Sequence, residues 1–194
     1  ELLQSRLPVG RFGGTFYDAN IGVGPQTFNN WASFDATSSV ISGMLLAGLV
    51  DNDPYTGAVI PWLAKKVEVL PDKLTYRATL RKGLRWSDGK PITSRDVTFT
   101  WNTVLKQGLG NPSTRSIVMV DGQFPQVRAL DAWTVEFKTP RPFAPFLRTL
   151  GVPIAPAHVF EPILKRGGPK AFDATWTSRD AAEHPERFVS SGMW

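Results

Sequence analysis

The sequence predicts a mixed α/β fold that is built from short elements. Its 194 residues include 16 prolines and 17 glycines, which interrupt long helices and exclude a helical bundle or a coiled coil. Residues 74–80 alternate apolar and polar side chains with the period of a half-buried strand. Other segments place an N-cap residue ahead of an apolar stripe with helical spacing. The length is enough for one domain with a buried core.

The first 50 residues are predicted to contain an arm, a strand and a helix. Residues 1–12 carry no pattern. Residues 13–18 begin with two glycines and contain an aromatic pair, which is typical of a strand that is opened by glycines. Asp35 is the predicted N-cap of a helix that runs to about Leu46 and stops at Gly48. The apolar stripe of this helix consists of Val40, Ile41, Met44 and Leu45.

The middle of the chain carries the clearest local signals. Residues 65–70 and 73–80 form a predicted hairpin that is joined by a Pro-Asp turn. Thr93, with Asp96 three positions later, resembles a capping box. The helix that begins there is expected to end at Gly108.

The second half continues with short elements. Residues 108–115 are expected to form a polar loop, and residues 127–130 and 133–137 form a second predicted hairpin. A helix over 156–165 begins at a proline and is stopped by two glycines. Residues 169–194 are polar, with isolated aromatic residues that include Phe172, Trp176 and Phe188.

Composition excludes several classes of protein. The net charge is +5, but the basic residues are scattered, which is typical of a solvated surface. Basic and aromatic residues interleave over 77–95, but Asp88 and Asp96 interrupt them, so no nucleic-acid partner is expected. The chain has no cysteine, which excludes disulfides and thiolate metal sites. Its longest mostly apolar stretch, 40–50, is far shorter than the ~20 residues that cross a bilayer.

The residues of common catalytic motifs are missing or wrongly spaced. His158 and His184 lack a second metal ligand at helical spacing, and a capping or packing role is the expectation for His158. Asp51 and Asp53 are two apart, but the turn at Pro54 explains them better than calcium does. No glycine motif fits a nucleotide phosphate. We therefore predict no catalytic residue, no metal and no cofactor, and hence no enzyme.

One segment, 63–101, carries a family resemblance. Residues 74–97 read LTYRATLRKGLRWSDGKPITSRDV, and residues 131–137 and 154–160 read DAWTVEF and IAPAHVF. In this order the segments closely resemble the extracytoplasmic solute-binding proteins of peptide- and nickel-type ABC importers, the family 5 of oligopeptide- and dipeptide-binding proteins. The colinear match extends over about 180 residues, and it ends in the stretch FVSSGMW at 188–194.

The resemblance implies an incomplete type II (cluster C) periplasmic-binding-protein fold. Residues 1–12 would be an N-terminal arm, and 13–50 a segment of the first lobe. Residues 51–150 would be an inserted subdomain rich in hairpins, which includes the 63–101 segment, and 151–194 would return into the first lobe. Relatives continue beyond the position of Trp194, so we expect this 194-residue chain to bind peptides weakly or not at all.

The resemblance also implies where a ligand binds. The loop after Asn29 and Asn30 corresponds to a loop that meets the peptide backbone in relatives, although relatives usually have proline where this chain has Asn30. For Asp35, a helix cap and a ligand contact are both compatible with the sequence. The implied ligand-binding residues are Phe34, Asp35, Ala36, Thr37, Arg115, Ser116 and Ser191.

The implied activity is solute capture outside the cytoplasm. A peptide or another small solute would bind in a cleft between two lobes, and a membrane permease would receive it. The resemblance implies a monomer in the periplasm or an equivalent extracytoplasmic location, with or without a lipid anchor, and an export signal that this chain does not carry. Two alternatives stay open: another solute such as a metal chelate, sugar or opine, and a sensing or chaperone-like role.

Overall fold

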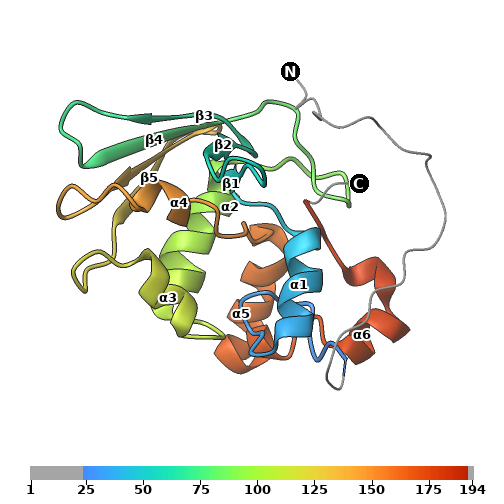
Figure 1. Cartoon of the computed structure of the whole chain (residues 1–194). Helices are drawn as coiled ribbons and strands as arrows, with labels where there is room; N and C mark the ends of the chain where they lie inside the picture. Colours follow the sequence, from blue (N-terminus) through green and yellow to red (C-terminus); the bar gives the residue numbers. More distant parts are fainter. Residues whose placement is uncertain (1–23, 192–194) are drawn as a thin grey trace.

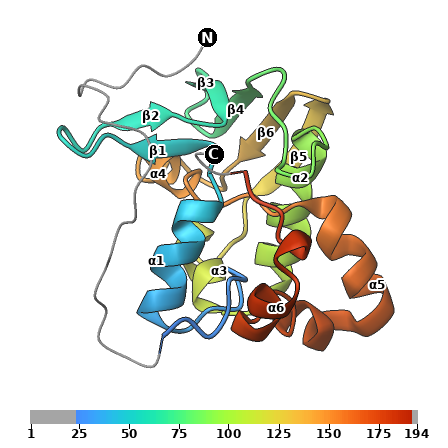
Figure 2. The ribbon, with the colours of Figure 1, turned by 90° about the vertical axis from the view of Figure 1, so that its right-hand side faces the viewer.

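The computed structural model describes residues 24–191, so the predicted arm 1–12 and the predicted strand 13–18 lie outside the described residues. A four-stranded sheet lies at one end of the molecule, and helices α1, α5 and α6 lie at the other (Figure 1 and Figure 2). In chain order the elements are α1 (Ala36–Leu45), β1 (Val50–Asn52), β2 (Val59–Pro61), β3 (Ala64–Val69), β4 (Thr75–Leu80), α2 (Ser94–Phe99), η1 (Thr100–Leu105), α3 (Ser113–Val118), β5 (Gln126–Asp131), β6 (Thr134–Lys138), α4 (Phe146–Thr149), α5 (Ala157–Asp173), α6 (Ser178–Glu183) and η2 (Pro185–Arg187).

Both predicted hairpins are confirmed and form one antiparallel sheet. Its strand order is β3-β4-β6-β5, because the two hairpins pair through β4 and β6. The first turn is fixed by Asp72, whose carboxylate accepts hydrogen bonds from the backbone N–H groups of Leu74 and Thr75 at 3.0 and 2.9 Å. The alternation in β4 buries Tyr76 and Ala78, so one face of the sheet covers the core.

The helix after the first hairpin begins at the predicted capping box. The Thr93 N–H donates to Asp96 Oδ2 at 2.9 Å, and α2 then continues directly into η1, a π-helical stretch. The other carboxylate oxygen of Asp96 accepts the N–H of Ala157 at 3.0 Å, the first residue of α5. One buried aspartate therefore holds the beginnings of two helices that are distant in the sequence.

Helix α1 is confirmed, but its most buried side chains are not those of the predicted apolar stripe. The buried residues of α1 are Ser38 and Ser42, whereas Val40 and Met44 are about half exposed, at 47% and 48%. Ser38 Oγ accepts the backbone N–H of Gln26 at 2.9 Å. The inward side of the helix therefore carries two serines that bind the preceding loop.

The C-terminal region folds more regularly than the sequence indicates. Part of the predicted loop 108–115 is helical, in α3, and α6 adds a helix after Trp176. Helix α5 extends past the predicted stop, with a break at Gly168, where φ is 64°. The isolated aromatics gather in one cluster with Phe160. The ring pairs of this cluster are Phe28–Phe188, Trp31–Phe160, Trp31–Phe172, Phe160–Phe172, Phe160–Trp176 and Trp176–Phe188.

Two segments that are distant in the sequence meet at the C-terminal end of α1. The Ile154 N–H donates to the Ala47 carbonyl at 2.9 Å, and the Leu49 N–H donates to the Leu150 carbonyl at 2.9 Å. Between these bonds Gly48 lies against Gly151, and a Cβ at position 48 would be 2.3 Å from the Gly151 carbonyl oxygen. Only glycine permits this approach of the two backbones.

Candidate functional site

The predicted ligand loop lies at the N-terminal end of α1. Asp35 caps the helix, since its Oδ1 accepts the backbone N–H of Ser38 at 2.7 Å. Hydrogen bonds from the side chain and the backbone of Ser38 lower the pKa of Asp35 below its usual value, so the carboxylate is charged at neutral pH. Phe34 is 76% exposed, and Ala36 is exposed while Thr37 is partly buried. The cap of Asp35 thus fixes the position from which Phe34 projects.

Two asparagines anchor this loop to the rest of the molecule. Asn29 is fully buried, and its Nδ2 donates to the Phe172 carbonyl at 2.7 Å. The carboxamide oxygen of Asn30 accepts the hydroxyl proton of Ser42 at 2.9 Å. Asn30 stands where the resemblance implies proline, and its side chain bonds to the buried face of α1.

The segment before α3 holds the loop from a second side. The Asn111 N–H donates to the Trp31 carbonyl at 2.6 Å, and Asn111 Nδ2 donates to the Ser33 carbonyl at 3.1 Å. Gly110 allows this contact, because a Cβ there would lie 2.2 Å from the Trp31 oxygen. Asn111 is thus bonded beside the position of Phe34.

Of the other predicted site residues, two follow the segment that holds the loop, and one lies far from the loop. Arg115 and Ser116 are exposed on α3, just after the bonds that Asn111 makes to the loop. Ser191 lies at the opposite end of α1, where its N–H donates to the Leu45 carbonyl at 3.1 Å. Its Oγ accepts the Ala47 N–H at 2.8 Å, and a hydroxyl group can accept and donate at the same time.

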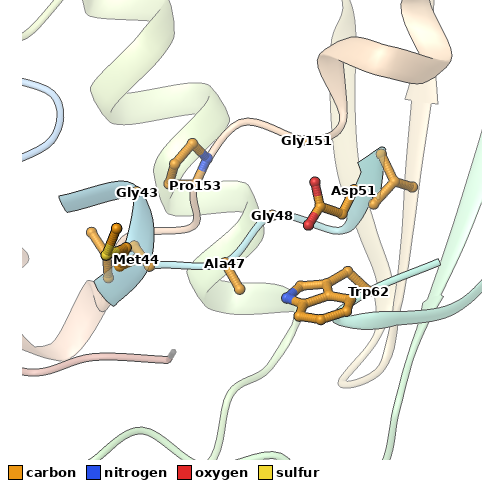
Figure 3. A pocket seen from close by; sticks show the side chains of 10 residues that line it. Gly43, Met44, Ala47, Gly48, Asp51, Trp62, Gly151 and Pro153 are labelled. Carbon is orange, nitrogen blue, oxygen red and sulfur yellow. The ribbon is translucent and has the colours of Figure 1, made fainter. Parts of the chain in front are cut away.

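Sequence reasoning missed a hollow at the C-terminal end of α1. It has a volume of about 320 Å³ and is lined by Gly43, Met44, Leu46, Ala47, Gly48, Val50, Asp51, Trp62, Gly151 and Pro153. Asp51 and Trp62 lie on one side of it, and Met44 and Pro153 on the other (Figure 3). The signal in the sequence was weak, because the wall comes from three separate stretches of the chain, 43–51, Trp62 and 151–153.

The histidine and aspartate candidates have structural partners. His158 Nε2 lies 2.8 Å from Asp88 Oδ2, and its ring packs edge-on near Trp86, with 6.3 Å between the ring centroids. This agrees with the expected packing role. Asp53 Oδ1 accepts the N–H groups of Tyr55 and Thr56, each at 2.9 Å, as in the turn expected at Pro54.

Neither a metal centre nor a membrane span is found within residues 24–191. In that part of the chain no three His, Cys, Asp or Glu side chains form a group that could hold a metal ion. None of its helices combines the length and the apolar character that crossing a membrane requires.

Comparisons with known proteins agree with the resemblance in the sequence. The family model "Bacterial extracellular solute-binding proteins, family 5 Middle" matches residues 58–194. A "Probable ABC transporter-binding protein" of Deinococcus radiodurans is 31% identical to 93% of this chain, which covers 30% of that relative. The dipeptide-binding protein of Escherichia coli is 31% identical, with 78% of this chain and 31% of the relative covered.

A solved structure shows the same fold. The periplasmic oligopeptide-binding protein of Borrelia burgdorferi superposes with a TM-score of 0.66 at 27% identity, and the match covers 89% of this chain and 35% of that one. The chain therefore spans about a third of the length of these relatives. The type II periplasmic-binding-protein fold expected from the resemblance is confirmed, as a partial domain. Members of this family bind solutes outside the cytoplasm and are not enzymes. The chain belongs to the bacterial extracellular solute-binding proteins of family 5.

Proposed function

We propose that this chain is part of the extracytoplasmic solute-binding component of an ABC importer. In this proposal the protein captures peptides in a cleft between two lobes and delivers them to a membrane permease, and it catalyses no reaction. The lobe segments would follow the predicted boundaries, with 51–150 as the inserted subdomain. The names of the relatives support peptides as the ligand class, since two of them bind dipeptides or oligopeptides.

The observation that carries the proposal is an exposed aromatic side chain on a firmly held loop. Phe34 is 76% exposed, although the loop around it is bonded to α1 through Asp35 and Asn30 and to the segment before α3 through Asn111. A preorganised loop loses little entropy when a ligand binds, and an exposed aromatic provides a large apolar contact. Phe34, Asp35, Ala36 and Thr37 are the proposed ligand contacts, with Arg115 and Ser116 beside them.

Calorimetric titration tests this proposal. Di-, tri- and oligopeptides, sugars and metal chelates would be titrated into the 194-residue chain and into the longest polypeptide that carries this sequence. We expect peptides to bind the longer polypeptide, and the 194-residue chain to bind weakly or not at all. Tight peptide binding by the 194-residue chain would contradict that second expectation. Binding of a sugar or a chelate, with no binding of peptides, would favour the other-solute alternative.

A variant of the loop tests the site itself. Phe34→Ser in the longer polypeptide should weaken peptide binding by about tenfold, the effect of losing roughly 1–2 kcal/mol of apolar contact. Tyr55→Ser is the matched control, because Tyr55 is also an exposed aromatic, at 64%, on a turn away from the loop. Equal affinities for the two variants would show that Phe34 makes no ligand contact. Peptide cleavage in a peptidase assay would contradict the non-enzymatic role.

A further inference from the structure

We propose that the hollow at the C-terminal end of α1 binds an organic ammonium group that is attached to a compact apolar body. Its walls include the carboxylate of Asp51 and the indole of Trp62 (Figure 3). The site goes beyond the proposed capture of peptides, because the loop at Phe34 lies at the other end of the helix. The volume of about 320 Å³ is at the lower end of the range for small-molecule sites, which suits a compact ligand.

Strand pairing places the carboxylate and the indole on the same face of a two-stranded ribbon. Asp51 of β1 pairs with Ile60 of β2, and Trp62 lies two residues beyond Ile60, on the same side as Asp51. Such diagonal neighbours are within reach of each other when one is an aromatic residue. A cation between them would contact a carboxylate and the electron-rich face of an indole.

Strand β1 also directs the positive charge of Arg148 away from the hollow. Asn52 follows Asp51, and its side chain points to the opposite face because successive side chains alternate along a strand. It is Asn52 that binds Arg148, through its Oδ1 at 2.6 Å. Arg81 is bonded to the Trp62 carbonyl through its Nε at 2.8 Å, and it is not among the residues that line the hollow.

The end of α1 adds negative potential to the hollow. Helix α1 has 10 residues and ends at Leu45, and two residues of its last turn, Gly43 and Met44, line the hollow. The carbonyl groups at a helix C-terminus carry a partial negative charge of about half an electron. The carboxylate, the indole and the helix end therefore favour the same kind of ligand, a cation.

The remaining wall selects for an apolar body behind the charged group. Met44, Leu46, Ala47 and Pro153 contribute hydrocarbon surface to it. A strongly hydrated ion such as Na⁺ gains little from such a wall, whereas an alkyl or aryl group is stabilised by burial against it. The favoured ligands are therefore primary amines with an alkyl or phenyl group. The ammonium group can belong to a free amine or to the N-terminus of a peptide.

Titration of the 194-residue chain with phenethylamine, followed by tryptophan fluorescence and calorimetry, tests the proposal. We expect saturable binding that 2-phenylethanol, the neutral analogue, does not reproduce. Asp51→Asn should weaken binding by about fivefold or more. Glu183→Gln removes the same charge from exposed helix α6 and should leave the affinity unchanged. The dipeptide Phe-Gly, with and without an acetylated N-terminus, distinguishes a peptide terminus from a free amine as the source.

The outcomes separate this site from the proposed peptide function. Failure to saturate at about 10 mM amine, equal binding of amine and alcohol, or an unchanged affinity in the Asp51→Asn variant would each overturn the ammonium site. Trp62→Phe provides a second variant that keeps an aromatic ring, and it should bind more weakly than the wild type but better than Trp62→Leu. None of these results depends on Phe34, so loss of the amine site leaves the proposed peptide capture untouched.

Discussion

Asp96 is expected to stabilise the fold more than an ordinary helix cap does. It is 4% exposed, and its two oxygens accept the N–H of Thr93 at 2.9 Å and the N–H of Ala157 at 3.0 Å. The first bond belongs to the capping box of α2, and the second caps α5. Asp96→Ala removes both acceptors at once, in a place where water does not replace them.

The cost of this substitution follows from the two bonds. Loss of a helix cap costs about 1 kcal/mol, and a buried N–H left without a partner costs about 1–3 kcal/mol more. Ala157 is 1% exposed, so its N–H would be such a group. We expect Asp96→Ala to lower the free energy of unfolding by about 2–4 kcal/mol. With a slope of about 2 kcal/mol/M in urea, the midpoint would fall by about 1–2 M.

Helix α6 offers a matched control for the second bond. It has the same capping box, in which Thr177 and Asp180 exchange hydrogen bonds, but Asp180 is partly exposed and serves only one helix. Asp180→Ala should therefore cost about 1 kcal/mol, as measured by urea unfolding followed by circular dichroism. If Asp96→Ala costs no more than Asp180→Ala, the bond to α5 contributes nothing and the reasoning is refuted.

Three further predictions concern the close backbone contact, the sheet and the aromatic cluster. Gly48→Ala should lower the free energy of unfolding by about 1–3 kcal/mol, because its Cβ would meet a backbone carbonyl at 2.3 Å; an unchanged urea midpoint would contradict that contact. Hydrogen bonds from Arg128 and then Arg77 lower the pKa of Glu136, so its stabilisation is present above the unfolded pKa of about 4.3 and is lost as the pH falls further. Urea unfolding at pH 7 and pH 3 should show a deficit of Glu136→Gln that shrinks in acid, and a constant deficit would exclude the ion pairs as its cause. Phe172→Ala should cost about 3–5 kcal/mol in the same assay, since the ring is fully buried, and a cost below about 1 kcal/mol would place the ring outside the core.

The sheet could be predicted because the sequence signals for its strands and turns lie within short stretches of the chain. The hairpin turns, the alternation in β4 and the capping box at Thr93 each depend on residues within a few positions of one another. The aromatic cluster could not be predicted in this way. Phe172, Trp176 and Phe188 stand in a polar context in the sequence, and two partners in the cluster come from more than 100 residues away: Phe28 contacts Phe188, and Trp31 contacts Phe172.

The candidate site was only partly accessible to sequence reasoning. The cap at Asp35 follows from a local rule, and the resemblance pointed to the loop around it. Asn111 had no signal of its own, because its role depends on bonds to residues about 80 positions earlier. The hollow beside Asp51 depends likewise on residues 151–153, which approach residues 43–51 at Gly48 from about 100 positions later in the chain.

Helix α1 explains why the site lies where it does. Hydrophobic periodicity identifies an apolar face, and the usual inference is that this face is buried. Here the most buried side chains are those of Ser38 and Ser42, which bind the backbone of Gln26 and the side chain of Asn30. These bonds satisfy polar groups that burial would otherwise leave unpaired, and two residues of the apolar stripe, Val40 and Met44, stay about half exposed. The same helix thus presents Phe34 at one end and one wall of the hollow at the other. The double substitution Ser38→Ala/Ser42→Ala removes the bonds that fix the orientation of the helix. It should therefore weaken ligand binding at both sites.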